Sequence, residues 1–142
     1  MAVTTKTVAE TCAEARRASR ALADAPTAAK DAALAATARL LGERTAEILA
    51  ANAADLADER AAGLNEALRD RLTLTADRVA AMAEGVRAVA ALADPIGEEL
   101  EGKSLASGLD LRKLRVPLGV VAVVYEARPN VTIDCAALQY GH

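Results

Sequence analysis

The residues best suited to chemistry stand in one short polar stretch, Glu126-Ala-Arg-Pro-Asn130. It follows an apolar run, residues 118–125, and precedes a helical pattern over residues 131–138. Arg128 carries a permanent charge on a planar group that suits phosphate or carboxylate, and Asn130 offers an amide donor of the kind that stabilises an oxyanion. The N-terminus of the following helix adds free N–H groups and the positive end of a dipole. The stretch therefore predicts a site for an anion or a developing oxyanion.

The same residues also suit a purely structural role. Asn130 can cap the helix, and Pro129 can simply stiffen a turn. Arg128 can pair with Glu126 or Asp134. Spacing alone does not separate this interpretation from the functional one.

Cysteine and histidine are sparse. Cys12 and Cys135 lie far apart without a CxxC pair, and the single histidine is His142, so we expect no metal site. Cys135 falls in the first turns of the predicted helix, where cysteine nucleophiles are often found. Because no base is placed beside it by sequence, a packing role is the interpretation we favour.

A strand is expected to carry the polar stretch. Residues 118–125 are continuously apolar and rich in valine, which predicts a buried strand. Residues 109–116 alternate imperfectly and predict a half-exposed strand with a bulge. Residues 96–108 predict a loop, and Pro117 separates the two strands. A fully apolar strand needs cover on both faces, and little else in the sequence can build that sheet.

The first two-thirds of the sequence predicts helices. Their expected ends are marked by caps and breakers, namely Asn52, Asn65 and Thr75 as N-caps and Asp94-Pro95 as a stop. The expected helices cover residues 5–23, 27–51, 53–62, 66–72 and 76–92.

Composition limits the class of protein. The 142 residues fit one domain, and the hydrophobic fraction of 53% is largely alanine, without Phe or Trp. Net charge is −3 with acids and bases interleaved, so we expect no nucleic-acid partner. The sequence shows neither a secretory leader nor an apolar run that spans a membrane, and we expect a cytoplasmic protein with reduced thiols.

The sequence of Arg115–Thr132, RVPLGVVAVVYEARPNVT, closely resembles the N-terminal half of γ-glutamyl phosphate reductases, a family within the aldehyde dehydrogenase superfamily. Further stretches resemble the same family in the same order. They are residues 48–56, 62–74, 81–87 and 94–97.

This resemblance implies an α/β fold, with an N-terminal helical region followed by the first strands of a Rossmann-type cofactor domain. Residues 1–142 would then be the N-terminal part of the NADP-binding domain, and mostly helical. Residues 1–94 would form the helical region and residues 95–117 a loop and an association strand. Residues 118–142 would hold the first buried strand, the oxyanion and cofactor loop and the start of a helix.

The resemblance also implies a reaction of proline biosynthesis. In the family, NADPH reduces L-glutamyl 5-phosphate to glutamate 5-semialdehyde with release of phosphate, after a cysteine attacks the acyl phosphate. Asn130 would match the oxyanion-hole asparagine. The cofactor would lie beside the main chain of four residues, with Arg128 also a candidate to face the substrate. These four are Glu126, Ala127, Arg128 and Pro129.

The sequence also departs from the family. The family chain continues into further strands, the nucleophilic cysteine and a catalytic domain, and Cys135 does not match that nucleophile. Residues 139–142 leave the family pattern. We therefore expect a truncated or frame-shifted form of the enzyme, or a gene fragment, that is inactive alone. The alternative is a helical interaction module that associates with a full-length reductase, and residues 102–116 are the segment expected to form a homo-oligomer.

Overall fold

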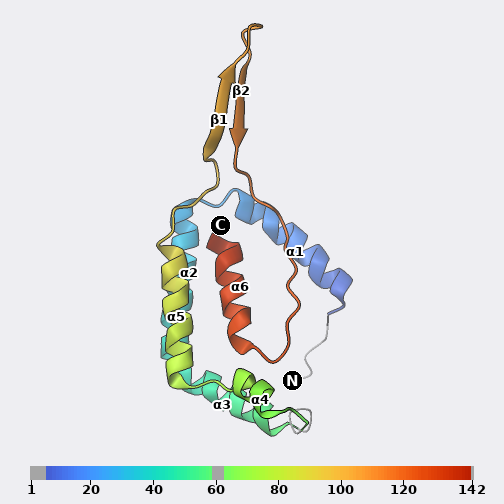
Figure 1. The fold of residues 1–142 in the computed structure, drawn as a ribbon, viewed down its shortest axis with the longest axis vertical. Helices are drawn as coiled ribbons and strands as arrows, with labels where there is room; N and C mark the ends of the chain where they lie inside the picture. Colours follow the sequence, from blue (N-terminus) through green and yellow to red (C-terminus); the bar gives the residue numbers. More distant parts are fainter. Residues whose placement is uncertain (1–5, 59–62, 142) are drawn as a thin grey trace. The chain divides into compact units, whose positions relative to one another are not determined.

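A computed structural model describes residues 6–58 and 63–141 (Figure 1). Of these residues 61% are helical, with one small two-stranded sheet among them, as the sequence predicted. It divides into two units. One unit holds the described residues up to Pro26 together with Ala93–Ala122, and the other holds Thr27–Leu92 with Val123–Gly141.

The second unit has its core where three helices meet. α2 (Thr27–Glu43) packs along α5 (Ala76–Ala90), and α6 (Pro129–Gly141) packs against both (Figure 1). The buried apolar residues recur every three or four positions, the period that places them on one face of a helix. They are Leu34, Ala38 and Leu41 of α2, Val79, Met82, Ala83 and Val86 of α5, and Ala137 of α6.

One glycine sets how closely α6 approaches its neighbours. A Cβ atom added at Gly141 would lie 2.9 Å from Cγ1 of Val89 and 3.5 Å from Cδ1 of Leu34. The first distance is shorter than side chains normally allow. The end of α6 therefore depends on the small size of glycine at this position.

α3 (Thr45–Ala57) corrects two helix predictions. The expected helix over 27–51 is interrupted at Arg44, where the Thr45 hydroxyl donates to the carbonyls of Leu41 and Gly42 at 3.0 and 2.9 Å. Such a side chain competes for carbonyls that would otherwise accept from the helix. The predicted restart at Asn52 is also wrong, because Asn52 is buried inside α3. Residues 59–62 of the expected 53–62 helix lie outside the described residues.

The next two predicted caps are confirmed. α4 (Glu66–Leu72) begins with the Asn65 side chain accepting from the Leu68 N–H at 2.9 Å. α5 begins with the Thr75 hydroxyl accepting from the Arg78 N–H at 3.2 Å. Both bonds satisfy N–H groups that have no partner inside the helix.

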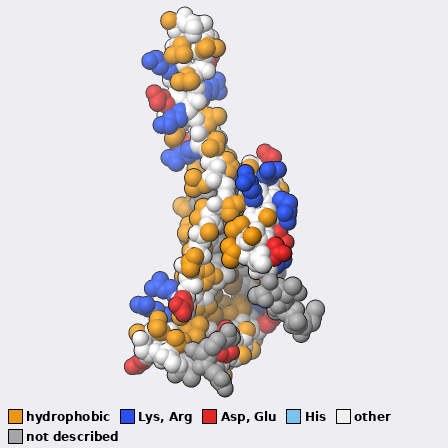
Figure 2. Space-filling view, turned by 90° about the vertical axis from the view of Figure 1, so that its right-hand side faces the viewer, with side chains coloured by type: hydrophobic (Ala, Val, Ile, Leu, Met, Phe, Trp, Pro, Cys, Tyr) orange, Lys and Arg blue, Asp and Glu red, His pale blue; other side chains and the backbone are white. Residues whose placement is uncertain are grey.

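The first unit contains a helix and a hairpin. α1 (Val8–Ala23) starts at Thr7 with a reciprocal capping box to Glu10. β1 (Glu99–Ser104) pairs antiparallel with β2 (Asp110–Leu114), and the pairing shifts register between Glu99 and Glu101. The loop predicted over 96–108 is therefore partly wrong, and the irregularity lies in β1 rather than in the 109–116 strand. Figure 2 shows hydrophobic side chains between basic ones along this hairpin.

Residues 117–125 do not form the predicted buried strand. Among the described residues none pairs with this segment, and Leu118 and Val124 are 93% and 98% exposed. Main-chain pairing of the hairpin ends at Arg115, whose N–H donates to the Glu98 carbonyl at 2.9 Å. Pro117 has no N–H to donate, and Gly119 turns the chain with φ +93°. Valine-rich sequence favours a strand, but a strand also needs a neighbour to pair with.

Candidate functional site

A strained turn leads into α6. Ala127, in the middle of the polar stretch, has φ 51°, in the left-handed region that costs a non-glycine residue about 1 kcal/mol. Pro129 begins the helix, where its fixed φ fits and its missing N–H is not needed. The Tyr125 hydroxyl lies 2.5 Å from the Thr132 hydroxyl, which ties the incoming chain to the first turn of the helix. The turn is thus held on both sides of the strained residue.

The side chain of Asn130 is held in one orientation within α6. Its Nδ2 donates to Oδ2 of Asp134, one turn further on, at 3.0 Å. An amide NH₂ has two hydrogens, so one remains for another acceptor. Asn130 is not the helix cap that the structural interpretation of the sequence allowed, since α6 already begins at Pro129.

An open cavity of about 450 Å³ lies beside the first turn of α6 and entirely within the second unit. Its polar lining comes from segments far apart in the sequence. These residues are Asp70, Arg71, Thr73 and Arg78 from α4 and α5 and the link between them, and Arg128, Asn130 and Asp134 from the start of α6. Of the five residues predicted for the site, Arg128 and Asn130 thus share a cavity, whereas Glu126, Ala127 and Pro129 do not line it.

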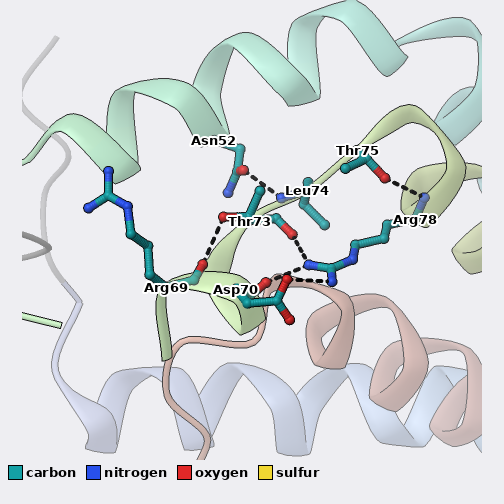
Figure 3. A network of polar contacts seen from close by, with 7 residues as sticks. All are labelled: Asn52, Arg69, Asp70, Thr73, Leu74, Thr75 and Arg78. Carbon is teal, nitrogen blue, oxygen red and sulfur yellow. Dashed lines mark hydrogen bonds and ion pairs between the residues drawn. The ribbon is translucent and has the colours of Figure 1, made fainter. Parts of the chain in front are cut away.

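Arg78 organises the side of the cavity formed by α4 and α5 (Figure 3). Its Nη2 donates to Oδ1 of Asp70 at 2.8 Å. Its Nη1 donates to the Thr73 carbonyl at 2.7 Å and also to the Asp70 carbonyl. One guanidinium therefore ties the end of α4 to the start of α5 and neutralises Asp70.

Asn52 of α3 also holds this connection in place (Figure 3). Its Nδ2 donates to the Leu72 carbonyl at 2.8 Å, and its Oδ1 accepts from the Leu74 N–H at 2.7 Å. The residue is 5% exposed, so both ends of a buried amide are satisfied. The segment between α4 and α5 is thereby fixed in place.

Two arginines that line the cavity have guanidinium groups that could bind an anionic ligand. In the part of the chain that the structure describes, neither Arg71 nor Arg128 forms a hydrogen bond or ion pair. Arg128 does not pair with Glu126 or Asp134, so the structural interpretation of this residue is not supported. Within the described ranges the Asp134 carboxylate bonds only the uncharged amide of Asn130 and pairs with no cation.

Sequence reasoning missed one whole side of this cavity. Asp70, Arg71 and Arg78 lie more than fifty residues before Asn130, in helices whose charged residues resemble any solvated surface. The capping residues Asn65 and Thr75 were the only nearby signal, because they fix where α4 ends and α5 begins. Nothing in the local sequence predicts that these ends face α6.

Metal chemistry finds no support among the described residues. No group of three or more His, Cys, Asp or Glu side chains there could hold an ion.

Cys135 is half-buried on α6, and Cys12 is exposed on α1. No helix within the described ranges is long and apolar enough to cross a membrane.

The fold matches that of solved reductases. A crystal structure of γ-glutamyl phosphate reductase from Thermotoga maritima superimposes with a TM-score of 0.89 and 36% identity, over 96% of this chain and 33% of that one. The same enzyme from Saccharomyces cerevisiae gives a TM-score of 0.86 and 29% identity, over 96% and 35%.

Curated sequences give the same name. The chain is 58% identical over 132 residues to the γ-glutamyl phosphate reductase of Koribacter versatilis, covering 93% of this chain and 32% of the relative. The reductases of Thermobifida fusca and Pectobacterium carotovorum are 54% and 56% identical over 124 residues, 87% of this chain and 30% of each relative. No protein-family model matches.

The resemblance predicted from the sequence is therefore confirmed: the chain is similar to part of γ-glutamyl phosphate reductases. It spans about a third of the length of the curated relatives it matches.

Proposed function

We propose that this chain supplies the cofactor loop and the oxyanion donor of a γ-glutamyl phosphate reductase. The reaction is the reduction of L-glutamyl 5-phosphate by NADPH to L-glutamate 5-semialdehyde, with release of phosphate, in proline biosynthesis. The proposal rests on one observation: Asn130 and Arg128 line the same cavity at the start of α6. Identity of 54–58% to reductases supports it.

The loop before α6 suits an anionic cofactor. Glu126 and Arg128 are exposed, and the Arg128 guanidinium has no polar partner among the residues described. The main chain of Glu126–Pro129 would hold NADP next to the helix N-terminus, where negative charge is favoured. Bound NADPH supplies the hydride for the reduction.

The remaining roles fall to side chains of the cavity. Asn130 would donate its second amide hydrogen to the acyl oxygen as negative charge develops there, while Asp134 keeps the amide nitrogen in place. Arg128 would face the phosphate or carboxylate of the substrate.

The nucleophile has to come from elsewhere. Neither Cys12 nor Cys135 matches the cysteine that the family uses, and neither lines the cavity. We therefore expect the 142 residues alone to give no turnover.

A combination assay tests the proposal. Purified chain is mixed with the part of the Koribacter versatilis reductase that it does not match, and NADPH oxidation is followed with L-glutamyl 5-phosphate. We expect turnover only when both are present, and loss of most of it with Asn130→Ala. Turnover by the chain alone, or full activity of the Asn130→Ala mixture, would contradict the proposed roles.

A second candidate function is that of a helical interaction module. Its support is the exposed apolar surface of the hairpin, where Leu109 and Leu111 are more than 60% exposed (Figure 2). The segment 102–116 would then join copies of the chain or a full-length reductase. Sedimentation should show a concentration-dependent dimer that Leu111→Lys removes, and a monomer at all concentrations argues against this candidate.

A further inference from the structure

We propose that the cavity beside α6 binds the amino-acid head of the substrate, with Arg71 on the α-carboxylate and Asp134 on the α-ammonium group. This assignment rests on the proposed function, because it takes an amino-acid substrate as given. It adds a residue of α4, Arg71, that neither the sequence pattern nor the family resemblance suggested.

The charges that the cavity leaves unneutralised define the ligand. Arg78 and Asp70 cancel each other at 2.8 Å. Arg71 and Arg128 have no polar partner among the described residues, and Asp134 bonds only a neutral amide. Two positive groups and one negative group therefore remain. An α-amino acid with a second anionic group at the end of its side chain carries the opposite set.

The position of Asp134 determines which group lies where. Asp134 and Asn130 are joined on α6, so the ammonium group would be bound one helical turn away from the oxyanion donor. Arg128 directly precedes α6, whereas Arg71 lies on the other side of the cavity at the end of α4. Arg128 is thus left for the anion at the reacting end, and Arg71 for the α-carboxylate.

The proposed hydrogen bonds of Arg71 to the α-carboxylate and of Asp134 to the α-ammonium group are both between charged groups, which makes them stronger than neutral ones. A guanidinium can hold a carboxylate by two parallel hydrogen bonds, and an ammonium group bonded to a carboxylate is also charge-assisted. A cavity of about 450 Å³ is within the usual range for small-molecule sites. Because Arg78 and Asn52 fix the segment that follows Arg71, this side of the cavity is formed before a ligand arrives.

The test uses L-glutamate as the probe and the full chain as the protein. Binding is measured by titration calorimetry and by changes in the NMR signals of cavity residues. Glutarate has both carboxylates but no ammonium group, and 4-aminobutyrate has no α-carboxylate. We expect both to bind about tenfold more weakly than L-glutamate, which corresponds to one lost charge-assisted bond.

Two variants assign the groups. Arg71→Gln should weaken L-glutamate and glutarate alike, by about tenfold. Asp134→Asn should weaken L-glutamate but leave glutarate unchanged or bound more tightly, because only the ammonium group uses that charge. Arg39→Gln and Asp31→Asn, at exposed positions on α2 outside the cavity, are the matched controls and should bind like the original chain.

Specific results overturn the assignment. Equal affinity for L-glutamate and glutarate removes the role of Asp134, and unchanged binding by Arg71→Gln removes that of Arg71. Absence of L-glutamate binding by a folded chain overturns the whole site. None of these results affects NADPH-dependent turnover in the combination assay, so failure of the site is distinguishable from failure of the proposed function.

Discussion

The amide nitrogen of Asn130 lies 3.0 Å from a carboxylate oxygen of Asp134, one helical turn further along α6. This hydrogen bond fixes which end of the amide faces the carboxylate, and it leaves one N–H for a ligand. An oxyanion donor must be oriented before charge develops, since reorientation during the reaction costs energy. The i to i+4 spacing of a helix is sufficient to produce this arrangement.

Asn130→Ala should therefore lower kcat of the combined reductase by about 100- to 1000-fold, the usual loss for one oxyanion donor, with little change in KM. The reason is that the donor acts mainly on the transition state. Steady-state kinetics in the combination assay measure both constants. Gln139→Ala, an exposed polar residue of the same helix, is the control and should leave kcat unchanged. A rise in KM alone would place Asn130 in ground-state binding.

Arg78→Ala should destabilise the second unit by about 1–3 kcal/mol, because it removes donors to the Asp70 side chain and to two carbonyls. Arg78→Lys should recover only part of this, since an ammonium group cannot reproduce the planar fork. Chemical denaturation measures both changes.

Arg87 provides the matched control on the same helix. Among the residues that the structure describes its side chain pairs only with Glu84, and both side chains are largely exposed. Arg87→Ala should cost less than about 1 kcal/mol, as surface pairs usually do. Equal effects at the two positions would mean that the Arg78 contacts contribute no more than a surface ion pair.

Local sequence was enough to place most of the helices but not the cavity. Asn65 and Thr75 were recognised as caps because a cap acts on its own next three residues. Asn52 was wrongly predicted to be a cap because its real partners, Leu72 and Leu74, lie some twenty residues away and no local pattern shows them. Arg71 lines the same cavity as Asn130 through the tertiary arrangement of the chain, which no short pattern encodes.

The strand predicted over residues 118–125 failed because strand formation depends on a second segment. Residues 118–125 have the composition of a buried strand, yet the structure forms no strand there. Pairing, however, is a property of two segments. β2 ends at Leu114, and Pro117 and Gly119 prevent the ladder from continuing. Valines that a sheet would cover therefore remain exposed in this chain.

Gly141→Ala should destabilise the packing of α6, because the added methyl would lie 2.9 Å from Cγ1 of Val89. Overpacking of this kind typically costs about 1–3 kcal/mol, and the better helix propensity of alanine offsets about 1 kcal/mol of it. Thermal unfolding followed by circular dichroism measures the difference. Gly85→Ala is the control, since a Cβ there meets nothing within 4 Å, and it should stabilise the chain.

The capping box of α1 should open at acid pH. The pKa of Glu10 lies below its ordinary value of 4.5 because its carboxylate accepts from the Thr7 main-chain N–H, and also from the Thr7 hydroxyl, both at 2.8 Å. A lowered pKa in the folded state means that the ionised form is the one stabilised. Its contribution is fully present above pH 4.5 and is lost as pH falls through the lower folded value.

Exchange of the Thr7 amide proton, measured by NMR across this pH range, reports the opening directly. After correction for intrinsic exchange, protection should decline below pH 4.5 in the original chain. In Glu10→Gln, protection should be weaker throughout and independent of pH, because the amide accepts a hydrogen bond but does not ionise. Loss of protection at the same pH in Glu10→Gln would assign the transition to another group, for which Glu14, whose pKa is lowered mainly by its hydrogen bond with Lys6, is the nearest candidate.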